Sequence, residues 1–343
     1  MQASCLVLFS GGLDSILACK VLQKAGIKVT ALKFVTPFFG SSALGDEERA
    51  GRAIGGRYGI DCRVIDISGD YLRMVVDPPH GYGKHMNPCI DCKILMVKTA
   101  LGLLDEYGAS FVATGEVPGQ RPMSQRTDTL RIIERESGAE GLLLRPLAAS
   151  LFRPVRAEEA GLFSGRDLPL ITGRGRKEQM KLAEKFGIED YPSPAGGCVL
   201  ADPILGKRFE KLFSMRPAPT VNDILLARTG RHFLLPDGAW FVVGRNRREN
   251  ERLKKLAVAG DMIMRFTGVP GPFSILRHIS GTAVAGQACE QGAELLARYV
   301  TKRGEGRIAV NVSQVDANGE ISFIRQIERP EQASRDIIKR LMF

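Results

Sequence analysis

The sequence predicts an α/β protein in which a domain built on a parallel sheet is followed by a smaller α+β domain. The chain has 343 residues, which is about twice the length of an ordinary domain of ~150 residues. Short apolar runs alternate with helical patterns over residues 1–200, as expected for βαβ units. Beyond residue 220 the pattern changes to short β-like runs. We therefore expect one domain over residues 1–213 and a second over residues 220–343.

The first domain is predicted to alternate strands with helices. Parallel strands joined by right-handed crossovers bind ligands beyond their carboxyl ends. The segments after Phe9, Phe34 and Ala113 are therefore where we expect the chemistry. The expected strands are 5–9, 29–35, 62–67 and 111–113, and the expected helices are 14–24, 47–58, 94–107 and 177–186.

The second domain follows a turn-rich segment, SMRPAPT, which we interpret as a linker. Its apolar runs are short and separated by polar turns, as in mixed α+β folds. The expected strands are 232–235, 240–243, 273–276, 307–312 and 321–327, and the expected helices are 248–258 and 285–299.

Composition indicates a globular chain from a reducing compartment. Hydrophobic residues make up 44% and charged residues 25% of the sequence, as in soluble domains. No window approaches the ~18 apolar residues of a membrane span, and the first residues lack the basic start of a signal peptide. Seven cysteines, an odd number, argue against a disulfide scaffold. We expect a cytoplasmic protein without a membrane partner.

Basic charge is concentrated in the second domain. The chain carries 48 Lys and Arg against 38 Asp and Glu, and residues 201–343 carry 23 against 15. A basic region of this kind suggests a polyanionic partner, and nucleic acid is the first candidate. Charge alone leaves the partner open, because many basic proteins bind no nucleic acid.

The segment SGGLDS follows the first predicted strand and begins the first predicted helix. Gly11 and Gly12 allow close approach of the backbone to an anion, while Ser10 and Ser15 add hydroxyl groups. The helix N-terminus supplies N–H groups and a positive dipole, so we predict a phosphate site. It is no Walker A loop, because no Gly-Lys-Ser/Thr follows. Asp14 is a candidate magnesium ligand, and an ordinary capped turn is the alternative.

This segment resembles the SGGxDS loop of the N-type ATP pyrophosphatases, the PP-loop superfamily. The resemblance implies a Rossmann-like ATPase domain that cleaves ATP between the α- and β-phosphates and adenylates an oxygen of its substrate. ATP and Mg²⁺ are the implied cofactors. Besides the loop itself, we expect the nucleotide to contact the chain near Phe34 and at Thr114 and Gly115, which follow two other predicted strands.

Three cysteines lie in polar or Gly-rich segments. Cys89 and Cys92 form a CxxC in NPCIDCK, just before a predicted helix, and Cys198 ends SPAGGC. A helix N-terminus favours the thiolate that binds metal or attacks. Three roles are possible for these cysteines: binding an iron–sulfur cluster, persulfide or disulfide chemistry, and binding zinc. A structural zinc site requires four ligands. Cys5, Cys19 and Cys289 lie in apolar patterns and are expected in the core.

The cysteine segments resemble those of tRNA-thiolating enzymes. NPCIDCK is similar to the segment of tRNA 2-thiouridylases with their first catalytic cysteine, matched by Cys92, and SPAGGC to the segment with the second, matched by Cys198. TGE…GQ…SQ, beginning at Thr114, is similar to a block of 4-thiouridine synthetases. Cys89 stands where 2-thiouridylases have aspartate, and Asp91 is a candidate replacement. Three such cysteines are similar to those that hold a 4Fe-4S cluster in iron–sulfur-dependent tRNA thiolases.

The resemblance implies an ATP-dependent tRNA sulfurtransferase with Cys89, Cys92, Cys198 and Asp14 as catalytic residues. A uracil carbonyl oxygen would be adenylated with release of pyrophosphate, and sulfur on a cluster or a cysteine persulfide would replace AMP. The donor would be inorganic sulfide, a cysteine desulfurase or a sulfur carrier. Two alternatives remain: an RNA-binding protein with a regulatory nucleotide site, and another PP-loop ligase or amidotransferase.

The second domain has its own resemblance. VVGRNRRENERL followed by GDMIMRFTGVPGPFSIL resembles the RNA-binding domain of the NFACT ribosome-associated proteins. This resemblance implies that five basic residues contact the tRNA. Their contacts with phosphates would position the tRNA without reading its base sequence. A solvated charged helix face is the alternative. The five residues are Arg245, Arg247, Arg248, Lys254 and Lys255.

Other charged residues of the first domain allow two interpretations each. Arg145 is a candidate phosphate clamp or an exposed side chain near a proline-containing loop. The basic segment ITGRGRK, residues 171–177, is expected to meet RNA or ATP phosphates. His80 and His85 flank the CxxC without metal spacing, so surface or loop positions are expected.

Overall fold

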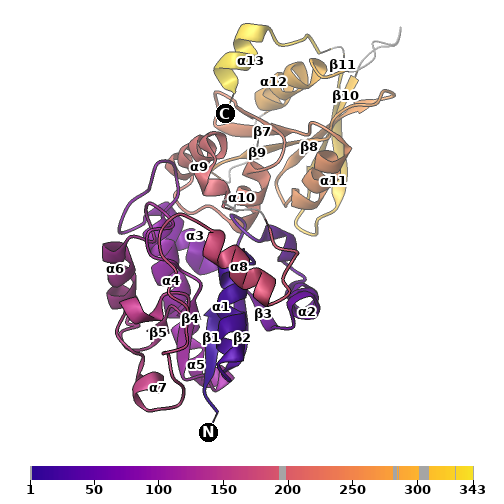
Figure 1. The fold of residues 1–343 in the computed structure, drawn as a ribbon. Coiled ribbons are helices and arrows are strands. Elements are labelled where there is room, and N and C mark those ends of the chain that lie inside the picture. Colours follow the sequence, from indigo (N-terminus) through magenta and orange to yellow (C-terminus); the bar gives the residue numbers. More distant parts are fainter. Residues whose placement is uncertain are drawn as a thin grey trace. The chain divides into compact units, whose positions relative to one another are not determined.

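The structure, a computed structural model, describes residues 2–192, 198–280, 284, 286–300, 309–328 and 330–342. It comprises two compact units, which we call the N-terminal unit (Met1–Pro203) and the C-terminal unit (Ile204–Phe343) (Figure 1). Each is described by itself. Within the described ranges, no helix combines the length and apolar character needed to cross a membrane.

The N-terminal unit is built on a five-stranded parallel sheet of order β3-β2-β1-β4-β5. The strand order reverses between β1 and β4, and such switch points are where open α/β sheets bind ligands. The predicted α/β fold class is confirmed. The strands are β1 (Ser4–Leu8), β2 (Lys28–Val35), β3 (Asp61–Asp66), β4 (Phe111–Thr114) and β5 (Leu143–Leu144).

Helices pack along this sheet, with α1 (Leu13–Lys24) against β1, β2 and α8 (Lys177–Lys185), and α4 (Cys89–Gly102) against β1, β4 and α6 (Thr127–Ser137) (Figure 1). The other helices are α2 (Glu47–Tyr58), α3 (Ser68–Val76), α5 (Leu104–Tyr107) and α7 (Arg156–Glu159), with short 3₁₀ turns at Ser41–Ala43, Ala149–Leu151 and Val199–Ala201.

The core of this unit forms between α1 and the sheet. Side chains from one face of β1, such as Cys5 and Val7, pack with Ile16, Leu17 and Cys19 of α1, as the alternation of strand side chains requires. Cys5 and Cys19 are buried, which confirms their expected position in the core. Burial raises the pKa of the Cys19 thiol well above its usual range, so this thiol stays neutral.

The C-terminal unit contains a six-stranded antiparallel sheet of order β11-β10-β8-β9-β7-β6. The strand β8 was not expected, because its MIMRFT sequence lacks a clear polar alternation. Residues 307 and 308 of one expected strand lie outside the described residues. The strands are β6 (Arg231–Leu234), β7 (Ala239–Val243), β8 (Met262–Thr267), β9 (Ser274–His278), β10 (Ala309–Val315) and β11 (Ile321–Glu328).

Helices cover parts of this sheet. The helix α12 (Gly286–Ala297) packs its buried side chains onto β7 and β9. The others are α9 (Pro203–Met215), α10 (Val221–Ala227), α11 (Arg247–Leu256) and α13 (Arg335–Leu341). Residue 213, the expected end of the first domain, lies inside α9. Arg208 of α9 donates a hydrogen bond to the Ala227 carbonyl oxygen at 2.6 Å, which joins α9 to the C-terminal unit.

Candidate functional site

The SGGLDS segment forms a tight loop between β1 and α1. Gly11 has φ +84°, a conformation that favours glycine. The Gly12 N–H donates to Ser10 Oγ at 3.2 Å, and Ser15 Oγ donates to the Gly12 carbonyl at 2.7 Å. Among the described residues, no side chain caps the start of α1. The Ser15 N–H donates to the Gly12 carbonyl oxygen, so the N–H groups of Leu13 and Asp14 are the ones placed to meet an anion.

Lys33 of β2 places a cation beside this loop. Its Nζ donates to the Ser10 carbonyl oxygen at 3.2 Å and would lie 3.5 Å from a Cβ at Gly11. Burial lowers the pKa of Lys33, whereas the nearby Cys62 raises it. An anion in the loop would offset the cost of burying this charge. Sequence reasoning missed Lys33; the available signal was a lysine in the middle of a largely apolar run, ALKFV.

Asp14 is held in the first turn of α1. Gln120 Nε2 donates to Asp14 Oδ2 at 2.8 Å, and Gln179 Nε2 donates to Gln120 Oε1 at 3.2 Å. Arg176, from the predicted basic segment, lies 3.9 Å from Asp14 Oδ2. Asp14 Oδ1 is buried and accepts no hydrogen bond from any residue the structure describes. An orphaned carboxylate oxygen at a phosphate loop fits a magnesium ligand.

The other expected nucleotide contacts lie at the carboxyl ends of neighbouring strands. Phe34 is buried near the end of β2. Thr114 ends β4, and its hydroxyl donates to Glu116 Oε2 at 3.0 Å. A Cβ on Gly115 would lie 2.5 Å from the carbonyl oxygen of Asp14. The segment after β4 therefore packs directly on the start of α1, at the sheet's switch point.

Cys89 and Cys92 occupy the first turn of α4, so the expectation that the CxxC precedes the helix is wrong. The helix begins at Cys89, and Pro88 stands at its N-cap, where the missing N–H of proline breaks no helical hydrogen bond. The spacing of three places both thiols on neighbouring positions of one helical face. Asn87 Nδ2 donates to Cys89 Sγ at 3.4 Å.

Cys198 reaches the same region through a chain of contacts. The next residue, Val199, donates its N–H to the Phe38 carbonyl oxygen at 3.1 Å. The Phe38 ring lies 5.6 Å from the ring of Tyr71, centroid to centroid, and Tyr71 hydrogen-bonds Cys92. Residues 193–197, the rest of the SPAGGC segment, lie outside the described residues.

The pKa of Cys92 depends on the two other thiols. Burial raises this pKa to about 12, the Tyr71 hydroxyl and Lys93 lower it, and Cys198 and Cys89 raise it. The thiols of Cys89 and Cys198 therefore act electrostatically on Cys92. Sulfur donors suit iron–sulfur clusters. Over the described part of the chain, however, no group of three or more His, Cys, Asp or Glu side chains is spaced to hold a metal ion.

The carboxylate of Asp91, the candidate replacement for the aspartate of 2-thiouridylases, is hydrogen-bonded to His80. The Nδ1 of His80 lies 2.8 Å from Asp91 Oδ1, and its backbone N–H donates to Oδ2 at 3.1 Å. The hydrogen bond to Asp91 raises the pKa of His80, as does the charge of Glu136. Asp91 thus fixes the loop that precedes the cysteines.

Arg145 is fully buried, so neither the phosphate clamp nor the exposed side chain predicted for it is correct. It donates to Glu134 Oε2 at 2.8 Å and to the Leu130 carbonyl at 3.0 Å. Its Nε lies 3.6 Å from Glu116 Oε2. Glu116 Oε1 in turn lies 3.7 Å from Lys93 Nζ. Sequence reasoning missed this link between β4 and the cysteine helix, which joins segments distant in sequence.

The basic residues expected to contact RNA lie on α11 and just before it. All five are exposed. Two are engaged locally: Arg245 Nε donates to Glu249 Oε1 at 2.9 Å, and Lys254 Nζ donates to Glu251 Oε1 at 2.7 Å. The other three predicted residues, Arg247, Arg248 and Lys255, lie on α11, which also carries the exposed Arg252. Such a face can contact successive phosphates.

Two family models match the chain in separate regions. Residues 1–150 match the model described as thiamine biosynthesis protein (ThiI). Residues 230–334 match the model described as NFACT protein RNA binding domain.

Curated relatives match the N-terminal part. A tRNA-specific 2-thiouridylase, MnmA, of Acidithiobacillus ferrooxidans is 28% identical over 189 residues, which are 53% of this chain and 49% of the relative. A "Probable tRNA sulfurtransferase" of Thermococcus kodakarensis is 26% identical over 147 residues, 43% of this chain and 37% of the relative. The chain thus spans about half the length, or less, of these relatives.

A solved structure of the U34-tRNA thiolase NcsA from Methanococcus maripaludis, with its 4Fe-4S cluster, is 18% identical and has a TM-score of 0.32. The match covers 65% of this chain and 70% of the NcsA chain. The resemblances predicted from the sequence are confirmed by the family models, which match residues 1–150 (ThiI) and residues 230–334 (NFACT protein RNA binding domain).

Proposed function

We propose that the chain is an ATP-dependent tRNA uridine thiolase, a tRNA sulfurtransferase. The observation that carries this proposal is the approach of the Cys198 segment to Cys89 and Cys92 in the first turn of α4, through the contacts of Val199 with Phe38 and of Phe38 with Tyr71. Lys93, the residue after Cys92, is tied through Glu116 to the strand whose end packs on the SGGLDS helix. The two family models and the thiouridylase relative support the same activity.

ATP binds with its phosphates at the start of α1. The loop N–H groups and the hydroxyls of Ser10 and Ser15 contact phosphate oxygens, and Lys33 supplies positive charge from β2. Asp14 Oδ1 has no partner among the described residues and would hold Mg²⁺ against the phosphates. When bound, the ion supplies charge neutralisation of the leaving pyrophosphate.

The chemistry begins at a uracil carbonyl oxygen of the tRNA. This oxygen attacks the α-phosphate of ATP, the bond to the β-phosphate breaks, and pyrophosphate leaves. The carbon that bears the adenylated oxygen then accepts sulfur, and AMP departs with that oxygen. Adenylation is needed because a carbonyl oxygen is a poor leaving group by itself. The target base must be unstacked to reach the site, which costs roughly a few kcal/mol.

Sulfur reaches the activated carbon from the cysteine site. In the persulfide route, the outer sulfur on Cys198 attacks the carbon, and the Cys92 thiol then forms a disulfide with Cys198 to release the thiocarbonyl. An external reductant reopens that disulfide. In the alternative route, Cys89, Cys92 and Cys198 would hold a 4Fe-4S cluster, which would supply a binding site for inorganic sulfide. In the persulfide route the donor is a cysteine desulfurase or a sulfur carrier that itself bears a persulfide, whereas inorganic sulfide would serve only the cluster route.

Thiolation of tRNA in vitro tests the proposal. Anaerobically purified protein is incubated with unmodified tRNA, ATP, Mg²⁺ and either sulfide or cysteine with a cysteine desulfurase, and the digested nucleosides are analysed by mass spectrometry. We expect thiouridine, with one AMP and one pyrophosphate per sulfur incorporated. ATP-modulated tRNA binding with no thiouridine would favour the regulatory nucleotide site instead. Iron content and the need for a reductant separate the two sulfur routes.

A further inference from the structure

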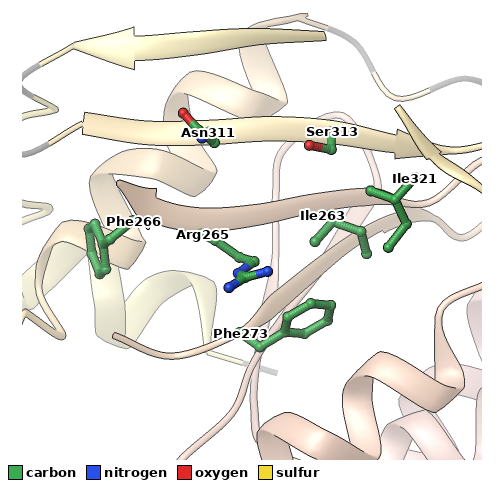
Figure 2. A pocket seen from close by; sticks show the side chains of 7 residues that line it. All are labelled: Ile263, Arg265, Phe266, Phe273, Asn311, Ser313 and Ile321. Atoms are coloured by element: carbon green, nitrogen blue, oxygen red, sulfur yellow. The ribbon is translucent and has the colours of Figure 1, made fainter. Parts of the chain in front are cut away.

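The C-terminal unit contains a pocket of about 270 Å³ on one face of its sheet. Its lining side chains come from β8, β10 and β11 and from the segment before β9 (Figure 2). Ile263 and Phe273 are buried and form an apolar floor, while Arg265 is exposed. Drug-sized ligands occupy pockets of about 300–1,000 Å³, so this pocket suits a group smaller than a drug-sized ligand.

The strand register fixes which residues share this face. Ser313 of β10 lies opposite Ile263 of β8, and Asn311 lies opposite Arg265. On its other side, Ser313 pairs with Phe323 of β11. Directly opposite residues project to the same face. Phe323 therefore stands beside the pocket, and its side chain is 61% exposed.

The polar groups of the pocket suit a nucleobase. Thr267 Oγ1 donates to Asn311 Oδ1 at 2.7 Å, which orients the amide and leaves its nitrogen to donate to a ligand. Arg265 forms no ion pair with any residue the structure describes, so its planar guanidinium can stack on a base. An exposed aromatic ring such as Phe323 offers a second stacking surface.

The neighbouring helix supplies charge for a phosphate backbone. The Phe273 N–H donates to Asn250 Oδ1 of α11 at 3.1 Å, so the pocket floor is tied to that helix. On α11, Arg247, Arg248 and Lys255 are exposed. Base pocket and phosphate contacts thus lie on connected elements of one unit, as single-stranded RNA requires.

We propose that this pocket binds an unstacked base of a single-stranded RNA segment, with the next base on Phe323 and the phosphates on α11. The inference rests on the proposed function, because it names the RNA contacts of the same protein. An acidic peptide would also suit the cations, but it has no group that needs Asn311 and two stacking surfaces.

Fluorescence anisotropy with the full-length chain tests the proposal. The probes are a labelled single-stranded oligoribonucleotide of mixed sequence and the same strand with abasic riboses. Stacking contributes ~1–3 kcal/mol per base, and 1.4 kcal/mol is tenfold in affinity. We expect about tenfold weaker binding for the abasic strand and for Phe323→Ala, and a smaller loss for Asn311→Ala. Gln314→Ala is the control, because Gln314 is exposed one residue from Ser313 and so points to the opposite side of β10.

Equal binding of both strands by the wild-type chain would overturn the base pocket, and that comparison requires no variant to fold. Competition by an acidic peptide that displaces the RNA equally from wild type and Phe323→Ala would also overturn it. Thiouridine formation is measured in parallel. A chain that thiolates tRNA but binds both strands equally refutes this inference alone, whereas a chain that binds no RNA refutes both proposals.

Discussion

Gly115, just after β4, lies so close to Asp14 that a Cβ on the glycine would stand 2.5 Å from the aspartate's carbonyl oxygen. The atom it would meet belongs to the backbone, so no side-chain rotation relieves the contact. This approach sets the end of β4 against the start of α1, where the phosphate loop lies.

Gly115→Ala is expected to weaken both the fold and ATP binding. Overpacking of this kind typically costs about 1–3 kcal/mol, and the displaced α1 start would lose its alignment with the phosphates. The matched control is Gly102→Ala, because a Cβ at Gly102 meets no described atom within 4 Å. Its free energy of unfolding should stay unchanged or rise by up to about 1 kcal/mol. Equal denaturation midpoints for the two variants would contradict the close approach.

ATP affinity should depend on the charge of Lys33. Burial lowers the pKa of Lys33 below the usual 10.5, so its ammonium loses a proton earlier than other lysines as pH rises. We expect the Kd for ATP to increase as pH rises through this lowered pKa, and Lys33→Arg to remove that dependence because arginine stays charged. Isothermal titration calorimetry across alkaline pH measures the effect. An identical pH profile for both proteins would exclude Lys33 from the phosphate site.

Arg277 is expected to stabilise the C-terminal unit through two buried carboxylates. Its Nε and Nη2 donate to Asp261 at 2.8 Å, and its Nη1 donates to Asp223 at 2.9 Å. Arg277→Met would leave buried negative charge without its partner, a change that costs about 3–5 kcal/mol. Urea denaturation measures the loss. Arg252→Ala, an exposed change on α11, should shift stability by no more than about 0.5 kcal/mol.

The cations of α11 should govern the salt dependence of tRNA binding. Each phosphate contact contributes about one unit to the slope of log affinity against log salt. Arg247→Gln with Arg248→Gln should therefore reduce the slope by about two. The control pair, Arg49→Gln with Arg52→Gln, removes exposed charges from α2 of the other unit. A slope lowered equally by both pairs would indicate a general charge effect.

Local sequence patterns predicted much of the fold. The helix over residues 47–58 was predicted to its last residue. Asp46 precedes it and Glu47 and Glu48 lie in its first turn, which are start signals, and Gly59 follows it as the stop signal. The SGGLDS loop was placed between a strand and a helix for the same reason: glycine and helix-start signals are local.

Contacts between segments that are distant in the chain could not be predicted from the sequence. Arg145 carries a surface-type side chain, and only the fold brings Glu116 and Glu134 around it. Tyr71 gives no sign of its hydrogen bond to Cys92, since α3 and α4 meet only in three dimensions. The start of α4 at Cys89 was missed because the polar NPCIDCK run does not show helical periodicity.

The most direct test of the account separates adenylation from sulfur transfer in a single turnover. Pyrophosphate and thiouridine are counted on the same tRNA for wild type, Cys198→Ser and the control Cys289→Ala, whose thiol is buried in the core of the C-terminal unit. The account predicts that Cys198→Ser releases pyrophosphate yet forms no thiouridine, while the control forms both. Thiouridine formed by Cys198→Ser at the wild-type rate would contradict it.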